Sequence, residues 1–117
     1  MIYFKRQEFD SPDIKESGAL MDADFLKKLN LARHKAAIPF KINSGYRTKA
    51  HNKKVGGKRN SSHLIGLAVD ISCKDSRSRS IILKSLLAVG FTRIGIGKTF
   101  IHVDDDVYKD QNVTWLY

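Results

Sequence analysis

Two histidines and one aspartate are the residues of this sequence best suited to chemistry. His63 and Asp70 lie seven positions apart in NSSHLIGLAVDI, residues 60–71, where the remaining side chains are mild or apolar, and His102 lies in FIHVD, residues 100–104. Two imidazoles and one carboxylate with an open fourth position form the ligand set of a catalytic zinc ion. A divalent cation would compensate these ionisable groups inside apolar surroundings, so we expect a metal site.

Two predicted strands must bring these residues together. In LAVDIS, residues 67–72, Asp70 alternates with the apolar Val69 and Ile71, and in FIHVD the side chains of His102 and Asp104 fall on one face. If the two strands are neighbours in one sheet, Asp70 and His102 converge. His63, at the end of the preceding polar stretch, can then complete the group.

The other predicted elements give an α+β domain with a small, mostly antiparallel sheet packed with helices. Asp22 is an N-cap for a helix over residues 23–36 that Pro39 stops, and a second helix over residues 77–89 ends at Gly90. We also expect a short strand in PFKIN, residues 39–43, a long polar excursion over residues 44–63, and a tight turn at Gly97 and Lys98. The length of 117 residues suits a single domain, residues 1–117.

Composition narrows the partners and the compartment. A net charge of +9 favours anionic partners, and the positive charge is densest in residues 46–60, YRTKAHNKKVGGKRN. A surface that binds nucleic acid usually adds exposed aromatic residues, and Tyr46 is the sole one in this segment, so we expect no nucleic acid as a partner. Cys73 is the single cysteine and cannot form an internal disulfide. The sequence predicts no signal peptide and no transmembrane segment, and we expect synthesis in the cytoplasm.

A specific motif surrounds the first histidine. SSHLIGLAVD fits S-x-H-x-x-G-x-A-x-D through Ser61, His63, Gly66, Ala68 and Asp70, with SGYR upstream and FIHVD downstream. This set resembles the zinc D-Ala-D-Ala carboxypeptidases, the M15-like peptidases of the hedgehog/DD-peptidase fold, which include L-alanyl-D-glutamate peptidases of phage endolysins. The resemblance spans roughly residues 20–106.

The resemblance implies a function and a set of site residues. It implies a zinc metallopeptidase that cleaves stem peptides of peptidoglycan, with His63, Asp70 and His102 as Zn²⁺ ligands. It further implies that Arg47 binds substrate or stabilises the oxyanion, with Ser61 as a second substrate-binding residue. A phage lysis or entry enzyme, acting at the bacterial cell wall, is the setting that such relatives suggest.

The catalytic base is open at this point. Many members of the resembled family place an acid three residues before the last histidine, where this chain has Thr99. Asp104, two residues after His102, is then either the general base or a residue that orients a ligand histidine. Because of Thr99, the alternative function is a non-catalytic, zinc-containing binding module of the same fold.

Overall fold

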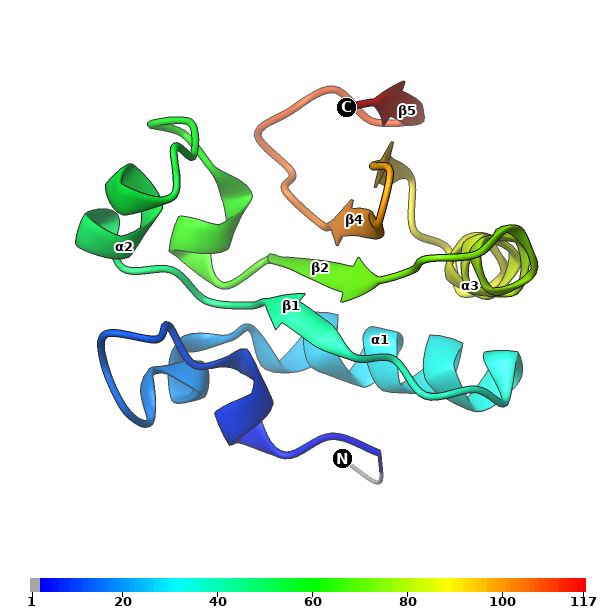
Figure 1. The fold of residues 1–117 in the computed structure, drawn as a ribbon, viewed down its shortest axis with the longest axis horizontal. Helices are drawn as coiled ribbons and strands as arrows, with labels where there is room; N and C mark the ends of the chain where they lie inside the picture. Colours follow the sequence, from blue (N-terminus) through cyan, green and yellow to red (C-terminus); the bar gives the residue numbers. More distant parts are fainter. Residues whose placement is uncertain (1–2) are drawn as a thin grey trace.

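A five-stranded sheet forms the centre of the computed structural model, which describes residues 3–117. The strands are β1 (Ile42–Ser44), β2 (Ala68–Ser72), β3 (Arg93–Ile96), β4 (Phe100–Asp104) and β5 (Val113–Leu116). They lie side by side in the order β1-β2-β4-β3-β5 (Figure 1). The sheet is mixed, because β3 and β5 are parallel while all other neighbours are antiparallel.

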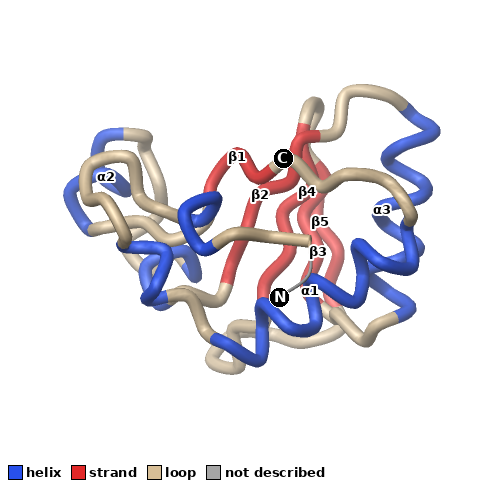
Figure 2. The backbone as a smooth tube through the Cα atoms, turned by 90° about the horizontal axis from the view of Figure 1, so that it is seen from below, coloured by secondary structure: helices blue, strands red, loops and turns tan. Residues whose placement is uncertain are grey.

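The two long helices lie on the same side of the sheet. Helices α1 (Ala23–Ala36) and α3 (Ser76–Ala88) contact each other there, whereas the short α2 (Lys49–Lys54) lies beyond the other side (Figure 2). Three 3-10 turns complete the described elements: η1 (Arg6–Phe9), η2 (Ser17–Leu20) and η3 (Ser62–Ile65). The α+β class predicted from the sequence is therefore confirmed. Among the helices of residues 3–117, none is both long enough and apolar enough to cross a membrane.

Both long helices begin at the capping residues that their sequences contain. The Asp22 carboxylate accepts a hydrogen bond of 2.9 Å from the Phe25 amide at the start of α1. Asp75 accepts one of 3.0 Å from the Ser78 amide at the start of α3. α1 ends where Ala37 adopts a left-handed conformation, before Pro39, and α3 ends two residues before Gly90. The two predicted helices are confirmed to within one residue.

Alternation along β2 and β4 separates the core from the chemistry. Val69, Ile71, Ile101 and Val103 are all fully buried in the core cluster that also contains Phe25 and Leu29 of α1. The residues between them, Asp70 and His102, point to the opposite face. One face of the sheet is thus committed to apolar packing, and the other is free to carry a polar site.

The structure corrects four local details of the sequence analysis. β1 begins at Ile42 instead of Pro39, and the polar excursion contains α2 and η3. The turn between β3 and β4 is centred on Lys98 and Thr99, one residue later than predicted, because the Gly97 amide donates a 2.9 Å hydrogen bond to the Phe100 carbonyl. β5 was not expected, since a four-residue strand at a sheet edge gives little periodic signal in the sequence.

Candidate metal centre

His63, Asp70 and His102 converge at one point on the polar face of the sheet. Each offers one ligand atom, and these atoms all lie within 4.8 Å of one another. His102 Nδ1 is 2.9 Å from Asp70 Oδ1, and His63 Nε2 is 3.4 Å from the same oxygen. The three residues predicted from the sequence are thus positioned as a possible metal site.

Strand pairing and a tight turn hold the three side chains. Asp70 and His102 are directly opposite each other in the β2–β4 register, so their side chains share one face. His63 lies in η3, and its Nδ1 is 2.7 Å from the Gly45 carbonyl oxygen, which leaves Nε2 facing Asp70. Gly66 ends η3 at φ 71°, where a Cβ would lie only 2.3 Å from the Leu20 carbonyl oxygen. Glycine is therefore required immediately after the histidine turn.

The donor set and its spacing fit a zinc ion. A tetrahedral zinc ion with bonds of about 2.0–2.2 Å spaces its ligand atoms about 3.3–3.5 Å apart. The two separations from Asp70 Oδ1, 2.9 Å to His102 and 3.4 Å to His63, lie close to this spacing, and all three ligand atoms lie within 4.8 Å of one another. His63 and His102 are buried and Asp70 is half-buried, so the ion would be shielded by protein on one side and open on the other.

The electrostatics of the cluster favour a cation. Burial acts to raise the pKa of Asp70, but hydrogen bonds with His102 and His63 outweigh it and hold that pKa well below its usual range. Burial acts to lower the pKa of His102, but hydrogen bonds with Asp104 and Asp70 leave it raised. The carboxylates of Asp70 and Asp104 both contact the His102 ring, so the negative potential there favours a positive charge. A metal ion would supply that charge in place of the second imidazole proton.

Asp104 contacts the ligand His102 from the side opposite Asp70. Its Oδ2 lies 2.7 Å from His102 Nε2, and its Oδ1 accepts a 2.7 Å hydrogen bond from Arg93 Nε. The Asp106 amide also donates to Asp104 Oδ1 at 3.1 Å. Burial acts to raise the pKa of Asp104, but the bonds with His102, the Asp106 amide and Arg93 hold it below the usual value. Both carboxylate oxygens are therefore engaged by the protein.

Arg47 lies on the other side of the centre, beside Asp70. One guanidinium nitrogen is 3.4 Å from Asp70 Oδ2, while Nε donates to Ser44 Oγ at 3.0 Å and Nη1 donates to Asn52 Oδ1 at 3.2 Å. The buried Asn52 also donates to the Lys58 carbonyl, so it ties Arg47 to the basic segment after α2. The guanidinium is fixed at the edge of the metal centre.

The centre opens into a cleft of about 600 Å³. Arg47, Ser61 and all three candidate ligands line it, and the Ser61 hydroxyl also accepts a 3.2 Å hydrogen bond from the His63 amide. The remaining lining residues comprise a mostly polar and basic group (Val55, Gly56, Gly57, Lys58, Asn60, Ser62, Lys109), a largely aromatic group (Phe100, Trp115, Leu116, Tyr117), and Arg93 with Asp104. Among residues 3–117, Asp70 and Asp104 are the acidic residues that line this cleft.

Sequence reasoning missed three residues that shape the site. Arg93 anchors Asp104, Asn52 anchors Arg47, and Trp115 lies with its ring centroid 5.5 Å from that of His102. The hairpin pattern could have indicated Arg93, because residues opposite each other in a hairpin share a face and Arg93 is opposite Asp104. Asn52 and Trp115 have no comparable signal, since their places depend on contacts that only the fold creates.

Comparison with known proteins identifies a family. A family model described as Peptidase M15 matches residues 3–104, most of the chain and all of the metal centre. A comparison with curated proteins finds no match.

Proposed function

The chain belongs to the peptidase M15 family, and from this premise we propose that it is a zinc-dependent peptidase acting on the stem peptides of peptidoglycan. The observation that carries the proposal is the convergence of His63, Asp70 and His102 beside an open cleft. A zinc ion held by these three residues would supply a Lewis acid that activates water and polarises a peptide carbonyl. The open side of the cluster leaves room for both reactants.

Arg47 is proposed to stabilise the negative charge that develops on the scissile carbonyl oxygen. Its guanidinium borders the ligand Asp70 and faces the cleft, and its other donors are held by Ser44 and Asn52. A donor that is fixed before the reaction costs no reorganisation when the charge appears. Ser61, which lines the cleft next to His63, is proposed to contact the substrate peptide.

Asp104 is proposed to orient His102. A carboxylate bonded to the second nitrogen of a ligand histidine fixes the ring and raises its basicity toward the metal. The 2.7 Å contact with His102 Nε2 and the 2.7 Å hydrogen bond from Arg93 support this role over that of general base, because they occupy both oxygens. Thr99 lies in the exposed turn before β4 and supplies no carboxylate, so a zinc ion held by His63, Asp70 and His102 would itself supply the acidity that activates water.

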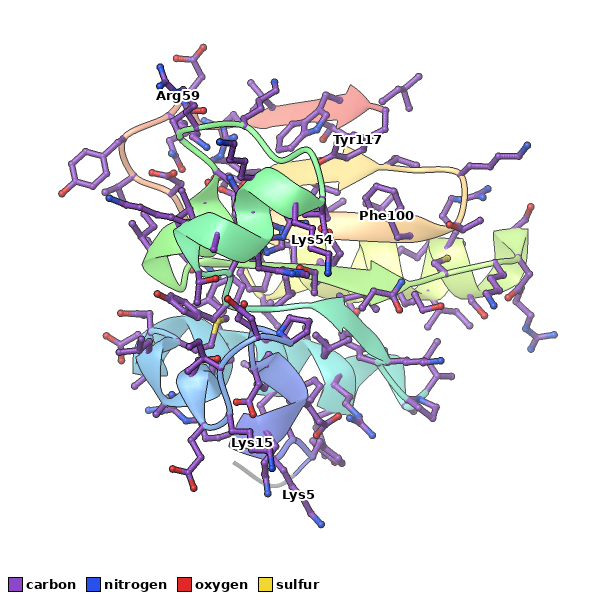
Figure 3. The ribbon with its side chains drawn as sticks, turned by 60° about the vertical axis from the view of Figure 1, so that its left-hand side comes forward. Lys5, Lys15, Lys54, Arg59, Phe100 and Tyr117 are labelled. Atoms are coloured by element: carbon purple, nitrogen blue, oxygen red, sulfur yellow. The ribbon has the colours of Figure 1, made fainter. Side chains whose placement is uncertain are left out.

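The positive charge of α2 and the segment after it supports an anionic polymer as the substrate. Lys53, Lys54, Lys58 and Arg59 are exposed on α2 and the segment after it, and no ion pair involves them among residues 3–117. Figure 3 shows Lys54 and Arg59 on this side of the molecule. Unpaired positive charge would concentrate the protein on an anionic cell wall. A phage lysis or entry enzyme is the setting we propose for such an activity.

Metal analysis combined with peptidoglycan digestion tests the proposal. The purified protein should hold one zinc ion per chain and should release new amino groups from peptidoglycan, and mass spectrometry of a muropeptide panel should identify the bond. His63→Ala should lose stoichiometric zinc and cleavage together. His34→Ala is the matched control, because His34 lies on α1, where it contacts Tyr3 and not the candidate metal centre. This variant should retain both zinc and cleavage.

Two outcomes would count against the proposal. Absence of stoichiometric zinc after reconstitution would remove the metal centre. Full zinc occupancy without cleavage of any muropeptide would favour a non-catalytic zinc-containing binding module of the same fold.

A further inference from the structure

Three aromatic side chains line one wall of the cleft, and we name them the aromatic shelf: Phe100, Trp115 and Tyr117. The Phe100 and Tyr117 ring centroids are 5.0 Å apart, and those of Trp115 and Tyr117 are 6.3 Å apart. Figure 3 shows Phe100 and Tyr117 close to each other on the sheet. The shelf reaches the metal centre, because the Trp115 and Tyr117 centroids lie 5.5 Å and 6.3 Å from that of His102.

The shelf depends on β5 and on a glycine beneath it. β5 pairs in parallel with β3 so that Trp115 is opposite Gly95, which is itself opposite His102. A Cβ at Gly95 would lie 2.6 Å from both Trp115 Nε1 and the Tyr117 ring. Only a residue without a side chain lets the two rings cross the sheet toward His102. Trp115 and Tyr117 follow the residues that the family model matches, whereas Phe100 lies within them.

The shelf is partly open to solvent. Tyr117 is 67 % exposed, whereas Phe100 and Trp115 are half-buried. The Arg93 guanidinium lies 5.0 Å from the Trp115 ring centroid and supports that ring within the protein. Rings that packed only to stabilise the fold would be expected to lie in the core, as Phe25 and Phe91 do. A supported but open aromatic surface beside reactive groups is typical of a binding subsite.

The chemistry around the shelf matches a sugar ring better than an aliphatic side chain. Aromatic faces attract the C–H face of a pyranose, while Tyr and Trp also carry a hydroxyl and an N–H at the ring edge. Lys58 and Asn60 line the same cleft and provide polar groups that could bind hydroxyl, amide or carboxylate oxygens at the edge of that sugar ring. An aliphatic side chain would use the rings alone and would make no use of the Lys58 and Asn60 side chains.

We propose that the aromatic shelf binds a sugar ring of the glycan strand to which the stem peptide is attached. This proposal rests on the proposed function, since it places the peptide at the metal centre and the adjoining sugar on Trp115 and Tyr117. The enzyme would then distinguish peptides still joined to glycan from free peptides. The distances of 5.5 Å and 6.3 Å between the two shelf rings and His102 make both contacts possible for one short substrate.

Trp115 is the single tryptophan of the chain, so its fluorescence reports directly on the shelf. The metal-loaded protein is titrated with the disaccharide of N-acetylglucosamine and N-acetylmuramic acid, which has no stem peptide to cleave. We expect a saturable change in emission, and Tyr117→Ala should weaken binding about 2- to 10-fold, the usual contribution of one aromatic contact. Tyr108→Ala is the matched control, because Tyr108 is 88 % exposed and does not line the cleft.

Specific results would overturn the proposal. An unchanged emission at high disaccharide concentration, or equal affinities for wild type and Tyr117→Ala, would reject the sugar subsite. A response to free stem peptide without any response to disaccharide would show that the shelf contacts peptide instead.

A kinetic comparison separates this proposal from the proposed function. Wild type should cleave a disaccharide-linked stem peptide with a lower KM than the free peptide, and Tyr117→Ala should reduce that difference while zinc content stays the same. Cleavage without any preference for the glycan-linked substrate would reject the shelf proposal and leave the peptidase intact. Disaccharide binding without cleavage of either substrate would reject the peptidase and leave the sugar subsite intact.

Discussion

Two arginines flank the candidate metal centre, and they make different contacts. Arg93 donates to Asp104 at 2.7 Å, and the two side chains are 10 % and 1 % exposed. It also donates to the Asp110 carbonyl at 2.5 Å. Arg47 lies 3.4 Å from Asp70, with both side chains 15 % exposed and facing the cleft. The difference teaches that two arginine–aspartate pairs can be built differently: Arg93 holds Asp104 in a buried pair, whereas the more exposed Arg47 faces the cleft, where we propose that it meets the substrate.

Replacement of Arg93 should have the largest effect, and it should act on stability. Arg93→Ala leaves the Asp104 carboxylate buried without its guanidinium, and removal of one partner of a buried ion pair typically costs about 3–5 kcal/mol. The free energy of unfolding, measured by urea denaturation of the metal-loaded protein, should fall by that amount. Arg47→Ala should lose less, because Asp70 is more exposed and retains its histidine partners. Equal losses would erase the distinction between the two arginines.

Replacement of Arg47 should act on turnover. Removal of one donor to a developing oxyanion typically lowers kcat about 100- to 1,000-fold, so Arg47→Ala should show a loss of that order with zinc still bound. Arg47→Lys keeps the charge but loses the planar fork, and it should restore only part of the rate. If Arg47→Lys is as active as wild type, the fixed guanidinium has no part in the mechanism.

The smallest expected effect belongs to Asp104, which connects Arg93 to the metal centre. Asp104→Asn keeps the shape but weakens the contact with His102, and loss of such a supporting contact typically costs about 10- to 100-fold in metal affinity. Excess zinc should then restore part of the activity. A drop in turnover with unchanged zinc affinity would instead make Asp104 the general base, and a plot of rate against added zinc separates the two roles.

Local patterns in the sequence were sufficient for the elements that carry the metal ligands. Asp22 and the apolar spacing that follows it predicted α1, and alternation in residues 67–72 and 100–104 predicted the shared face of Asp70 and His102. Each of these signals is encoded within a few neighbouring residues. The convergence of the ligands needed one further assumption, that β2 and β4 are neighbours, and the register between them confirms it.

The missed features depend on contacts between distant segments. α2 has six residues and no apolar stripe, so its sequence KAHNKK resembles a solvated loop. The parallel pairing of β3 with β5 places Trp115 over Gly95, twenty positions away in the chain, and no local periodicity encodes that contact. Prediction of the shelf would have required the fold first, because the rings and the histidine meet only across three strands.

The position of Tyr117 has a practical consequence for handling the protein. The carboxyl end of the described chain lies beside β5 at the top of the molecule in Figure 1, and Tyr117 itself lines the cleft. An oligohistidine purification tag fused after Tyr117 would begin beside the cleft, where its imidazoles would compete with His63 and His102 for the proposed zinc ion. A tag at the amino end would avoid that competition, because Tyr3 bonds to Asn30 of α1 and η1 contacts β1, and neither Tyr3 nor η1 lines the cleft.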